Sequence, residues 1–319
     1  MSKILLLFFM ILPGIHALSQ DSTRINIDQD MVSRSQWDEE QAPPLKVFYS
    51  QKLINAKTVE LLQKGVLEFN VTHNFGDIGG SNGGIRRFYG LDNASDVRIG
   101  FQLGLSDHIN VVAARAKGAG PVQQLWELGL KWQLLKQDPQ PGKRPVSLTV
   151  YANNVISSMQ ANAFPDQENS FDNLSDRMSQ VIQLMLARRF GNVSLQLSPT
   201  IVHRDYVVSN DDATQLAIGA AARIPFSRKL IFIADYFHTF RSSSSKDFFA
   251  TQGFHFYDAL GAGFEILTHG HVFHVNFTNA TEILENRFLP RTVTSWGKGQ
   301  FRWGFTISRN FILFRDKSK

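Results

Sequence analysis

The most constraining feature of this sequence is a period of two in hydrophobicity that recurs along most of its length. The clearest example is the segment 124–135, QLWELGLKWQLL, where every second residue from Trp126 to Leu134 is large and apolar. The residues between them are glutamate, glycine, lysine and glutamine. Because successive side chains of a β-strand point to opposite faces, this segment predicts a strand with one apolar and one polar face.

Comparable segments follow one another through the chain. We predict strands over residues 66–75, 97–105, 109–117, 124–135, 146–155, 178–190, 193–203, 214–226, 230–240, 254–267, 271–278 and 301–307, the last with an apolar continuation at 311–314. Their lengths suit tilted strands that cross a bilayer, which need roughly 9–11 residues. No sequence repeat accompanies them, which disfavours a propeller or a β-helix.

The connections between the predicted strands are sorted by length. Most links after even-numbered strands are short, whereas most links after odd-numbered strands are long, with GAGP at 118–121 as a short exception. This asymmetry is typical of barrels with short periplasmic turns and longer extracellular loops. We therefore predict an all-β fold, a closed antiparallel transmembrane β-barrel of about 12 strands. A soluble exported sandwich is the alternative fold.

The N-terminus has the features of a secretory signal peptide. Lys3 precedes an apolar run at 4–12, and the small residues Ala17 and Ser19 lie before a plausible cleavage point, so residues 1–19 are expected to be removed on export. The run is too short for an anchor helix, which needs roughly 20 apolar residues. Residues 20–64 predict a periplasmic lead-in, with a short helix or an irregular segment at the barrel rim over 52–64. Residues 65–319 would then form the barrel in the bacterial outer membrane.

Composition excludes several classes of function. The 319 residues contain no cysteine, so neither disulfides nor thiolate chemistry is available. The net charge of +5 comes from scattered basic residues, which disfavours a nucleic-acid partner. His269, His271 and His274 cluster around a predicted turn, but 271 and 274 would face opposite sides of a strand. We therefore expect no metal site and no cofactor.

Five segments resemble a known family. They are GVLEFNVTHNFGDI, YGLDNASDVRIGFQLGL, VSLQLSPTIVHRD, HGHVFHVNFTNA and WGKGQFRWGFTISRNF. In order and spacing, from about residue 52 to the C-terminus, they resemble a family of predicted outer-membrane β-barrel proteins of Gram-negative bacteria that is described as a domain of unknown function. The chain departs from the family at Asn74, where a basic residue is expected, and at Gln300, where an acidic one is expected. The resemblance implies fold and location, and it implies no reaction.

The strand phases also predict which side chains face the lumen and which face lipid. The candidates for the lumen are Arg98, Arg115, Glu127, Lys131, Glu265, His274 and Arg302. The candidates for a lipid-facing aromatic girdle are Trp126, Trp132, Phe273, Phe277 and Trp303. Charges inside a barrel either form a salt-bridged filling or line a solute path, and a barrel of this size permits both.

The function that we expect is a passive pore or transport component for small solutes, with outer-membrane lipid around it. A non-conducting structural barrel that binds a partner through long loops such as 156–177 and 279–299 is the alternative. A lipid-active enzyme is disfavoured, because His203 would share a strand face with Leu197 and Ile201 and not with Ser194 or Ser198. We therefore expect no enzyme activity.

Overall fold

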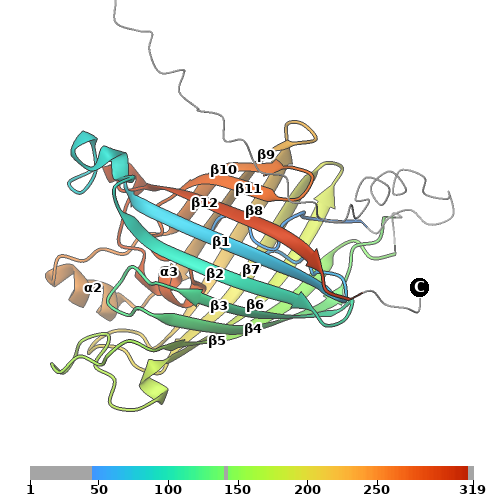
Figure 1. The fold of residues 1–319 in the computed structure, drawn as a ribbon. Helices are drawn as coiled ribbons and strands as arrows, with labels where there is room; N and C mark the ends of the chain where they lie inside the picture. Colours follow the sequence, from blue (N-terminus) through green and yellow to red (C-terminus); the bar gives the residue numbers. More distant parts are fainter. Residues whose placement is uncertain (1–44, 140–142, 315–319) are drawn as a thin grey trace, which may run out of the picture. The chain divides into compact units, whose positions relative to one another are not determined.

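The computed structural model describes residues 45–139 and 143–314 and shows an antiparallel β-barrel (Figure 1). Each strand pairs with its neighbours in sequence, and β12 pairs with β1, which closes the barrel. The predicted fold class and the count of twelve strands are therefore confirmed. The strands are β1 (Val66–Asp77), β2 (Ala94–Gly104), β3 (Ile109–Ala116), β4 (Leu125–Leu135), β5 (Ser147–Ser157), β6 (Met178–Phe190), β7 (Val193–Arg204), β8 (Thr214–Pro225), β9 (Leu230–Phe240), β10 (Ala259–Leu267), β11 (Val272–Thr278) and β12 (Arg302–Ile312).

One strand begins later than its aromatic pattern predicts. Residues 254–258 lie outside β10, because Phe256 packs against Phe249 and under the guanidinium of Arg241, whose carbon is 3.7 Å from the ring centroid. Helices also occur within the connections, and none of them was predicted. They are α2 (Ser243–Thr251), α3 (Glu285–Arg291) and the 3-10 turns η2 (Ile85–Gly90), η3 (Ser175–Arg177) and η4 (Trp296–Lys298).

The two ends of the barrel differ. At one end, here called the short-turn end, β1 begins and β12 ends. The connections 105–108, 191–192, 226–229 and 268–271 lie at this end, as do the end of β4 and the start of β5. At the other end, the long-loop end, lie the connections 78–93, 117–124, 158–177, 205–213, 241–258 and 279–301. Antiparallel pairing of neighbouring strands brings alternate connections to the same end.

The two faces of the sheet are inverted relative to a soluble protein. In β7, Ser194, Gln196 and Ser198 are buried inside the barrel, whereas Leu195 and Leu197 are 47% and 50% exposed on its outside. Polar inside and apolar outside is the pattern of a strand between a lumen and lipid. The described residues hold no helix that is long and apolar enough to cross a membrane.

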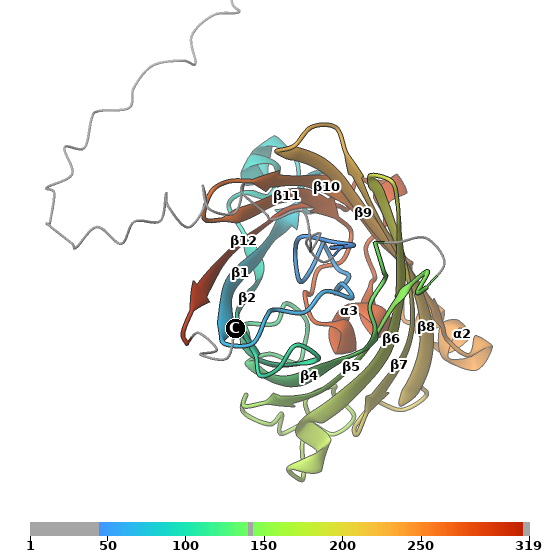
Figure 2. The ribbon, with the colours of Figure 1, turned by 90° about the vertical axis from the view of Figure 1, so that its right-hand side faces the viewer.

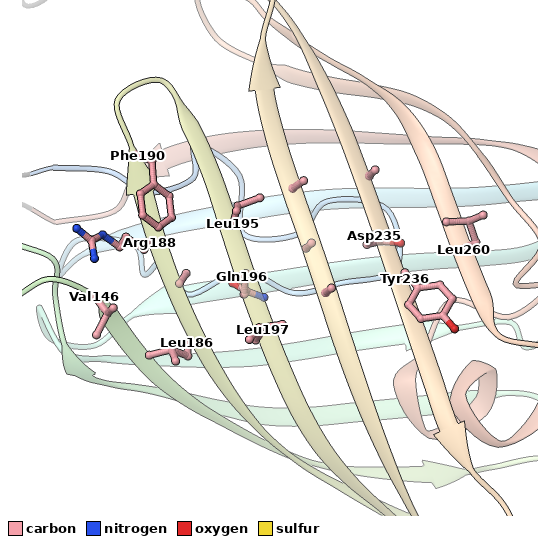
Figure 3. Close-up of a pocket in the computed structure, with 15 residues that line it drawn as sticks. Val146, Leu186, Arg188, Phe190, Leu195, Gln196, Leu197, Asp235, Tyr236 and Leu260 are labelled. Carbon is pink, nitrogen blue, oxygen red and sulfur yellow. The ribbon is translucent and has the colours of Figure 1, made fainter.

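The outer face carries a shallow apolar groove across β5 to β10, with a volume of about 580 Å³ (Figure 3). Apolar side chains that line it include Ala220, Ala222, Ala234, Leu186 and Leu197. These side chains belong to the outward-facing set, so the groove is separate from the lumen.

The lumen is occupied by the chain itself. Residues 45–62, here called the plug, run inside the ring of strands, and α3 lies inside the same ring (Figure 2). Val47, Phe48 and Leu53 are at most 1% exposed. The stretch 52–64 forms no helix and is irregular, which is the second of the two expected forms. Its expected place at the rim is wrong for residues 52–62, which lie in the lumen, whereas Gln63 and Lys64 are exposed. Residues 1–44, with the predicted signal peptide, lie outside the described residues.

Candidate functional site

The plug folds as a tight reversal within the lumen. The N–H of Leu53 donates to the carbonyl of Ala56 at 2.8 Å, and the N–H of Thr58 donates to the carbonyl of Gln51 at 3.1 Å. Lys52 and Lys57 face each other across the reversal as an isolated bridge. The tip of the plug therefore comprises residues 53–56.

Asp235 of β9 holds this tip. Its carboxylate accepts the backbone N–H groups of Ile54, Asn55 and Ala56 at 3.1, 2.7 and 2.8 Å, together with the side-chain amide of Asn55 at 2.8 Å. Asp235 is 2% exposed, so these donors replace its lost hydration. Hydrogen bonds to a charged acceptor are among the stronger ones in proteins. The plug is therefore fastened at its deepest point to the barrel wall.

Further contacts fasten the remainder of the plug. Gln196 accepts the N–H of Val59 at 2.9 Å and donates to the carbonyl of Lys57 at 2.7 Å. Lys131 donates to Gln51 at 3.0 Å and to the carbonyl of Glu60 at 2.6 Å. Because the plug forms no continuous strand pair with the barrel, these inner-face side chains satisfy its backbone.

Burial changes the pKa of two ionisable groups of the plug. The carboxylate of Glu60 accepts the N–H groups of Val47 and Phe48, and burial still raises its pKa above the ordinary value. Burial beside Arg98 and Lys57 lowers the pKa of Lys52 to about 8. Charge on these side chains is therefore coupled to the position of the plug in the lumen.

A four-residue charge cluster lies at the middle of the lumen. Lys57 of the plug contacts Glu127 of β4 at 3.1 Å and Glu285 of α3 at 2.7 Å. Arg98 of β2 pairs with the other oxygen of Glu127 at 2.7 Å, and the hydroxyl of Tyr151 donates to Glu127 at 2.5 Å. All four charged side chains are less than a tenth exposed, and their charges balance. The cluster joins the barrel wall, the plug and α3.

The α3 segment enters from the long-loop end and meets the plug through this cluster. Phe288 packs on Phe237 of β9 with ring centroids 5.3 Å apart, and the amide of Asn286 donates to Ser179 of β6. Pro290 lies in the last turn of this seven-residue helix, and every residue from Glu285 to Pro290 is buried. The lumen is thus filled from both ends by segments of the same chain.

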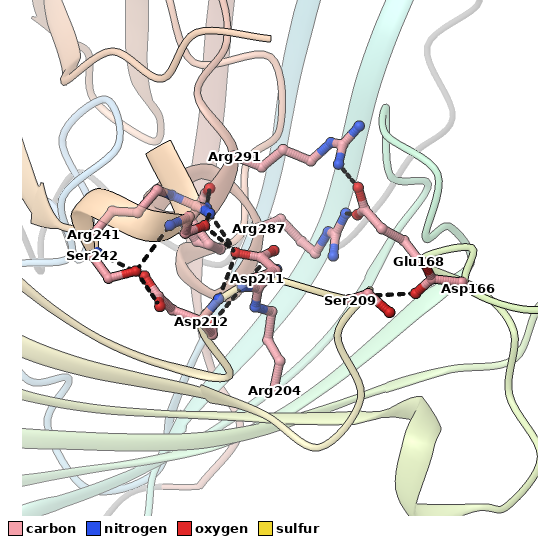
Figure 4. A network of polar contacts seen from close by, with 12 residues as sticks. Asp166, Glu168, Arg204, Ser209, Asp211, Asp212, Arg241, Ser242, Arg287 and Arg291 are labelled. Carbon is pink, nitrogen blue, oxygen red and sulfur yellow. Dashed lines mark hydrogen bonds and ion pairs between the residues drawn. The ribbon is translucent and has the colours of Figure 1, made fainter. Parts of the chain in front are cut away.

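Ion pairs between loops hold α3 in place (Figure 4). Arg287 pairs with Glu282 at 2.9 Å and with Glu168 of the loop 158–177 at 3.3 Å, and Arg291 pairs with Glu168 as well.

A second group of contacts reaches α3 from the loops 205–213 and 241–258. Arg241 donates to the carbonyl of Pro290 at 2.6 Å and pairs with Asp211, which also binds Arg204. Four of the long connections therefore meet around α3.

Little space remains beside the plug. The cavity between the plug and the strands β1 to β3, β11 and β12 has a volume of about 20 Å³, which is close to the room that one water molecule needs. A solute larger than water therefore has no room in this part of the lumen in this conformation.

A serine, a histidine and a carboxylate meet inside the lumen, but they do not form a catalytic triad. Ser50 lies 3.2 Å from Nε2 of His274, and Glu265 contacts that same nitrogen at 3.3 Å while also accepting from the serine hydroxyl. Nδ1 of His274 faces the carbonyl of Leu53 at 3.0 Å. In a triad the acid and the nucleophile bind opposite ring nitrogens. Here the three side chains connect the plug to β10 and β11.

Six of the seven predicted lumen residues lie buried on the inner face. Arg98, Glu127 and Lys131 contact the charge cluster or the plug, as described above. Glu265 also pairs with Arg223 at 2.8 Å, and Arg302 pairs with Asp77 at 2.7 Å. The sixth is His274, which is 2% exposed.

The inward prediction for Arg115 is wrong. Its guanidinium lies over the ring of Trp126 at 5.1 Å on the outer face and donates to the carbonyl of Ala116. The segment INVVAARA lacks a clear alternation, so its phase could not be read from the sequence. A long cationic side chain near a strand end can reach the polar interface from the outer face.

The five girdle candidates all lie on the outer side of their strands. Trp132 and Phe273 are near the short-turn end, and Trp126, Phe277 and Trp303 are near the long-loop end. Phe277 and Trp303 pack together with ring centroids 4.3 Å apart. Aromatic residues thus mark both ends of the apolar face.

Comparisons with known proteins agree with this architecture. A family model described as "Membrane bound beta barrel domain (DUF5777)" matches residues 48–311. Its description agrees with the resemblance identified in the sequence, and the match includes most of the plug. Among curated proteins, none matches the chain.

Solved porin structures share the barrel at very low identity. The KdgM porin is 7% identical over 77% of this chain and 99% of its own, with a TM-score of 0.44. The NanC porin is 6% identical over 78% and 100%, with a TM-score of 0.44. The outer membrane protein Omp33 of Acinetobacter baumannii is 11% identical over 77% and 97%, with a TM-score of 0.36. These similarities are too distant to carry an argument about solute or gating.

Proposed function

Because this chain belongs to the family of membrane bound β-barrel domains, we propose that it is an outer-membrane channel for small solutes, closed in this conformation by the plug and α3. The signal peptide predicted at 1–19 would direct its export, and its long-loop end would face outward. Passage requires no chemistry in the barrel. The partners of the protein would be outer-membrane lipid and the passing solute.

The way in which the lumen is filled supports this proposal. The barrel strands present polar side chains to the interior, and several of these, such as Gln196, Asp235 and Lys131, bind the plug. A barrel with a purely structural interior can be filled by its own side chains. Here segments outside the strands, the plug and α3, fill the lumen (Figure 2).

Planar-bilayer recordings test the proposal. We expect the refolded full chain to conduct rarely and a variant that lacks residues 45–62 to conduct steadily, since deletion removes the plug but no strand. In that variant, Lys131→Glu should shift the reversal potential toward cation selectivity, because position 131 would then line the path. A folded variant that lacks both residues 45–62 and residues 285–291 and shows no conductance would contradict the channel.

A second candidate is a non-conducting barrel that presents its loops to a partner. The ion pairs of Figure 4 favour it, since they tie several long connections into one surface. The same recordings separate the two candidates. A non-conducting barrel shows no conductance after deletion of the plug, but a channel would give the same result if α3 alone filled its lumen. A further deletion of 285–291 removes that possibility.

A further inference from the structure

A polar cavity of about 460 Å³ lies at the long-loop end. It is enclosed by the ends of β1, β2 and β12 and by the loops 78–93, 117–124 and 279–301. This volume lies within the range of small-molecule sites, which is about 300–1,000 Å³. We call this cavity the vestibule.

The charges that line the vestibule favour an anion. They come from Arg87, Lys117 and Arg302, opposed by the single carboxylate of Asp77. Asp77 is engaged by Arg302 at 2.7 Å. Lys117 is bound only by the backbone carbonyls of Ala94 and Ser95, and no carboxylate among the described residues pairs with Arg87. The vestibule therefore offers cationic groups that its own carboxylate does not neutralise.

Arg302 has an unused donor. The side chain is 2% exposed, and its Nη2 donates to Asp77 and, at 3.2 Å, to Thr294. Its Nε has no hydrogen-bond partner among the described residues. A buried donor without a partner is costly, so a ligand that accepts from the Arg302 guanidinium would gain free energy there.

Neutral groups in the vestibule are suited to hydroxyls. The side-chain amides of Asn82 and Asn93 make no hydrogen bond with any described residue, and the hydroxyl of Thr281 lines the same wall. Amides and hydroxyls both donate and accept, so they match the hydroxyl groups of a polyol. Phe88 and Tyr89, with φ of 45° and 53°, follow Arg87 in the left-handed region, and such conformations persist only where the surroundings hold them.

The vestibule also adjoins the segments that close the lumen. Asp96 beneath it accepts the N–H of Gly118 at 2.8 Å and that of Ile283 at 2.9 Å, which links the loop 117–124 to the residues before α3. Thr281 and Thr294 flank α3 on both sides. A molecule in the vestibule would therefore touch the connection that carries α3.

We propose that the vestibule binds small polyhydroxylated carboxylates, the class to which sugar acids belong. This inference rests on the proposed channel function, since it names the solute class that would meet the closed mouth. The carboxylate would take the donors of Arg302 and Arg87, and the hydroxyls would take the amides of Asn82 and Asn93.

Calorimetric titration of the full chain in detergent micelles at low ionic strength tests this proposal. The probe is D-gluconate, compared with sorbitol, which keeps the hydroxyls, and propionate, which keeps the charge. We expect sorbitol and propionate to bind at least about tenfold more weakly than gluconate. Arg87→Gln should weaken gluconate by about tenfold, whereas Arg228→Gln, at an exposed arginine of the turn 226–229, should leave it unchanged.

Several results would overturn the proposal. They are no binding of gluconate, equal binding of sorbitol or propionate, or equal affinity in Arg87→Gln and the parent. Arg87 is exposed, so its substitution leaves the barrel intact, and Arg302→Gln provides the corresponding test of the buried cation. Binding is measured without conductance, so failure here leaves the recordings on the plug-deleted channel as a separate result.

Discussion

Among single residues, the cluster of Lys57, Arg98, Glu127 and Glu285 brings four buried charges into contact in the lumen. Each of these side chains loses hydration, and the pairing offsets that cost only while every partner is present. Glu127 contacts both cations, so it is the residue on which the cluster depends most.

Glu127→Gln should lower the free energy of unfolding by about 3–5 kcal/mol, because it leaves Arg98 buried without a carboxylate. Urea unfolding of the detergent-folded protein measures this loss. Asp247→Asn on α2, an exposed carboxylate far from the lumen, should change stability by less than about 0.5 kcal/mol. Similar losses in the two variants would refute the role of the cluster.

The lowered pKa of Lys52 predicts that the stability of the fold depends on pH. Its pKa is lowered to about 8 in the fold, below the value of an unfolded lysine, so the unfolded chain binds the proton more tightly. The charged form opposes folding at pH 7, and stability should rise as pH increases from about 8 toward 10. Thermal unfolding of Lys52→Met should show a higher Tm at pH 7 and a smaller rise over this interval. Lys246→Met, at an exposed lysine of α2, should retain the rise of the parent.

The sequence could predict single residues only where their strand has a clear alternation. Glu127 and Lys131 were placed inward because tryptophans and leucines alternate with them. Arg115 was misplaced because its neighbours are small or apolar on both faces. The partners of Glu127 could not be predicted, since Lys57 and Glu285 come from segments without periodicity.

At the scale of elements, the plug and α3 are the parts that strand patterns do not reveal. The plug has no repeat of two or of 3.6 residues because inner-face side chains satisfy its backbone. Its apolar residues, such as Val47, Phe48 and Leu53, indicate burial, but not where. The polar residues Gln196 and Asp235 on inner faces were visible in the sequence, yet an inward polar residue equally suits an open lumen.

Asp235→Asn should loosen the tip of the plug, because one amide cannot accept all four donors that the carboxylate accepts. Hydrogen exchange at the amides of Ile54, Asn55 and Ala56 should become at least about tenfold faster. Exchange in the ladder between β6 and β7 should not change and is the internal control. Unaltered exchange at the tip would show that Asp235 does not hold it.

At the scale of the whole molecule, the barrel was predictable because its constraint is repeated in every strand. A single period of two is ambiguous, but twelve of them with sorted connections leave few alternatives. The apolar outer face then follows, and the match to a membrane bound β-barrel family agrees with it.

Leu130→Arg tests this outer face. Leu130 is 45% exposed near the middle of β4, so an arginine there would lie against hydrocarbon and should cost about 2–4 kcal/mol in a bilayer. Leu174→Arg is the matched control, since Leu174 is 65% exposed in the loop 158–177 and outside the apolar band. Unfolding from liposomes measures both variants, and equal stabilities would contradict membrane placement of β4.

If movement of the plug opens the channel, a reversible lock between the plug and the barrel wall should control conductance. A Cβ added to Gly261 would lie 2.7 Å from Cγ2 of Ile54, so Ile54→Cys with Gly261→Cys places two thiols within reach in a chain that has no other cysteine. The pair is introduced together with Asp235→Asn and Gln196→Ala, which remove plug fasteners. In planar bilayers we predict conductance after reduction, closure after oxidation and recovery with dithiothreitol. Equal conductance in the oxidised and reduced states would show that movement of the plug does not open the channel.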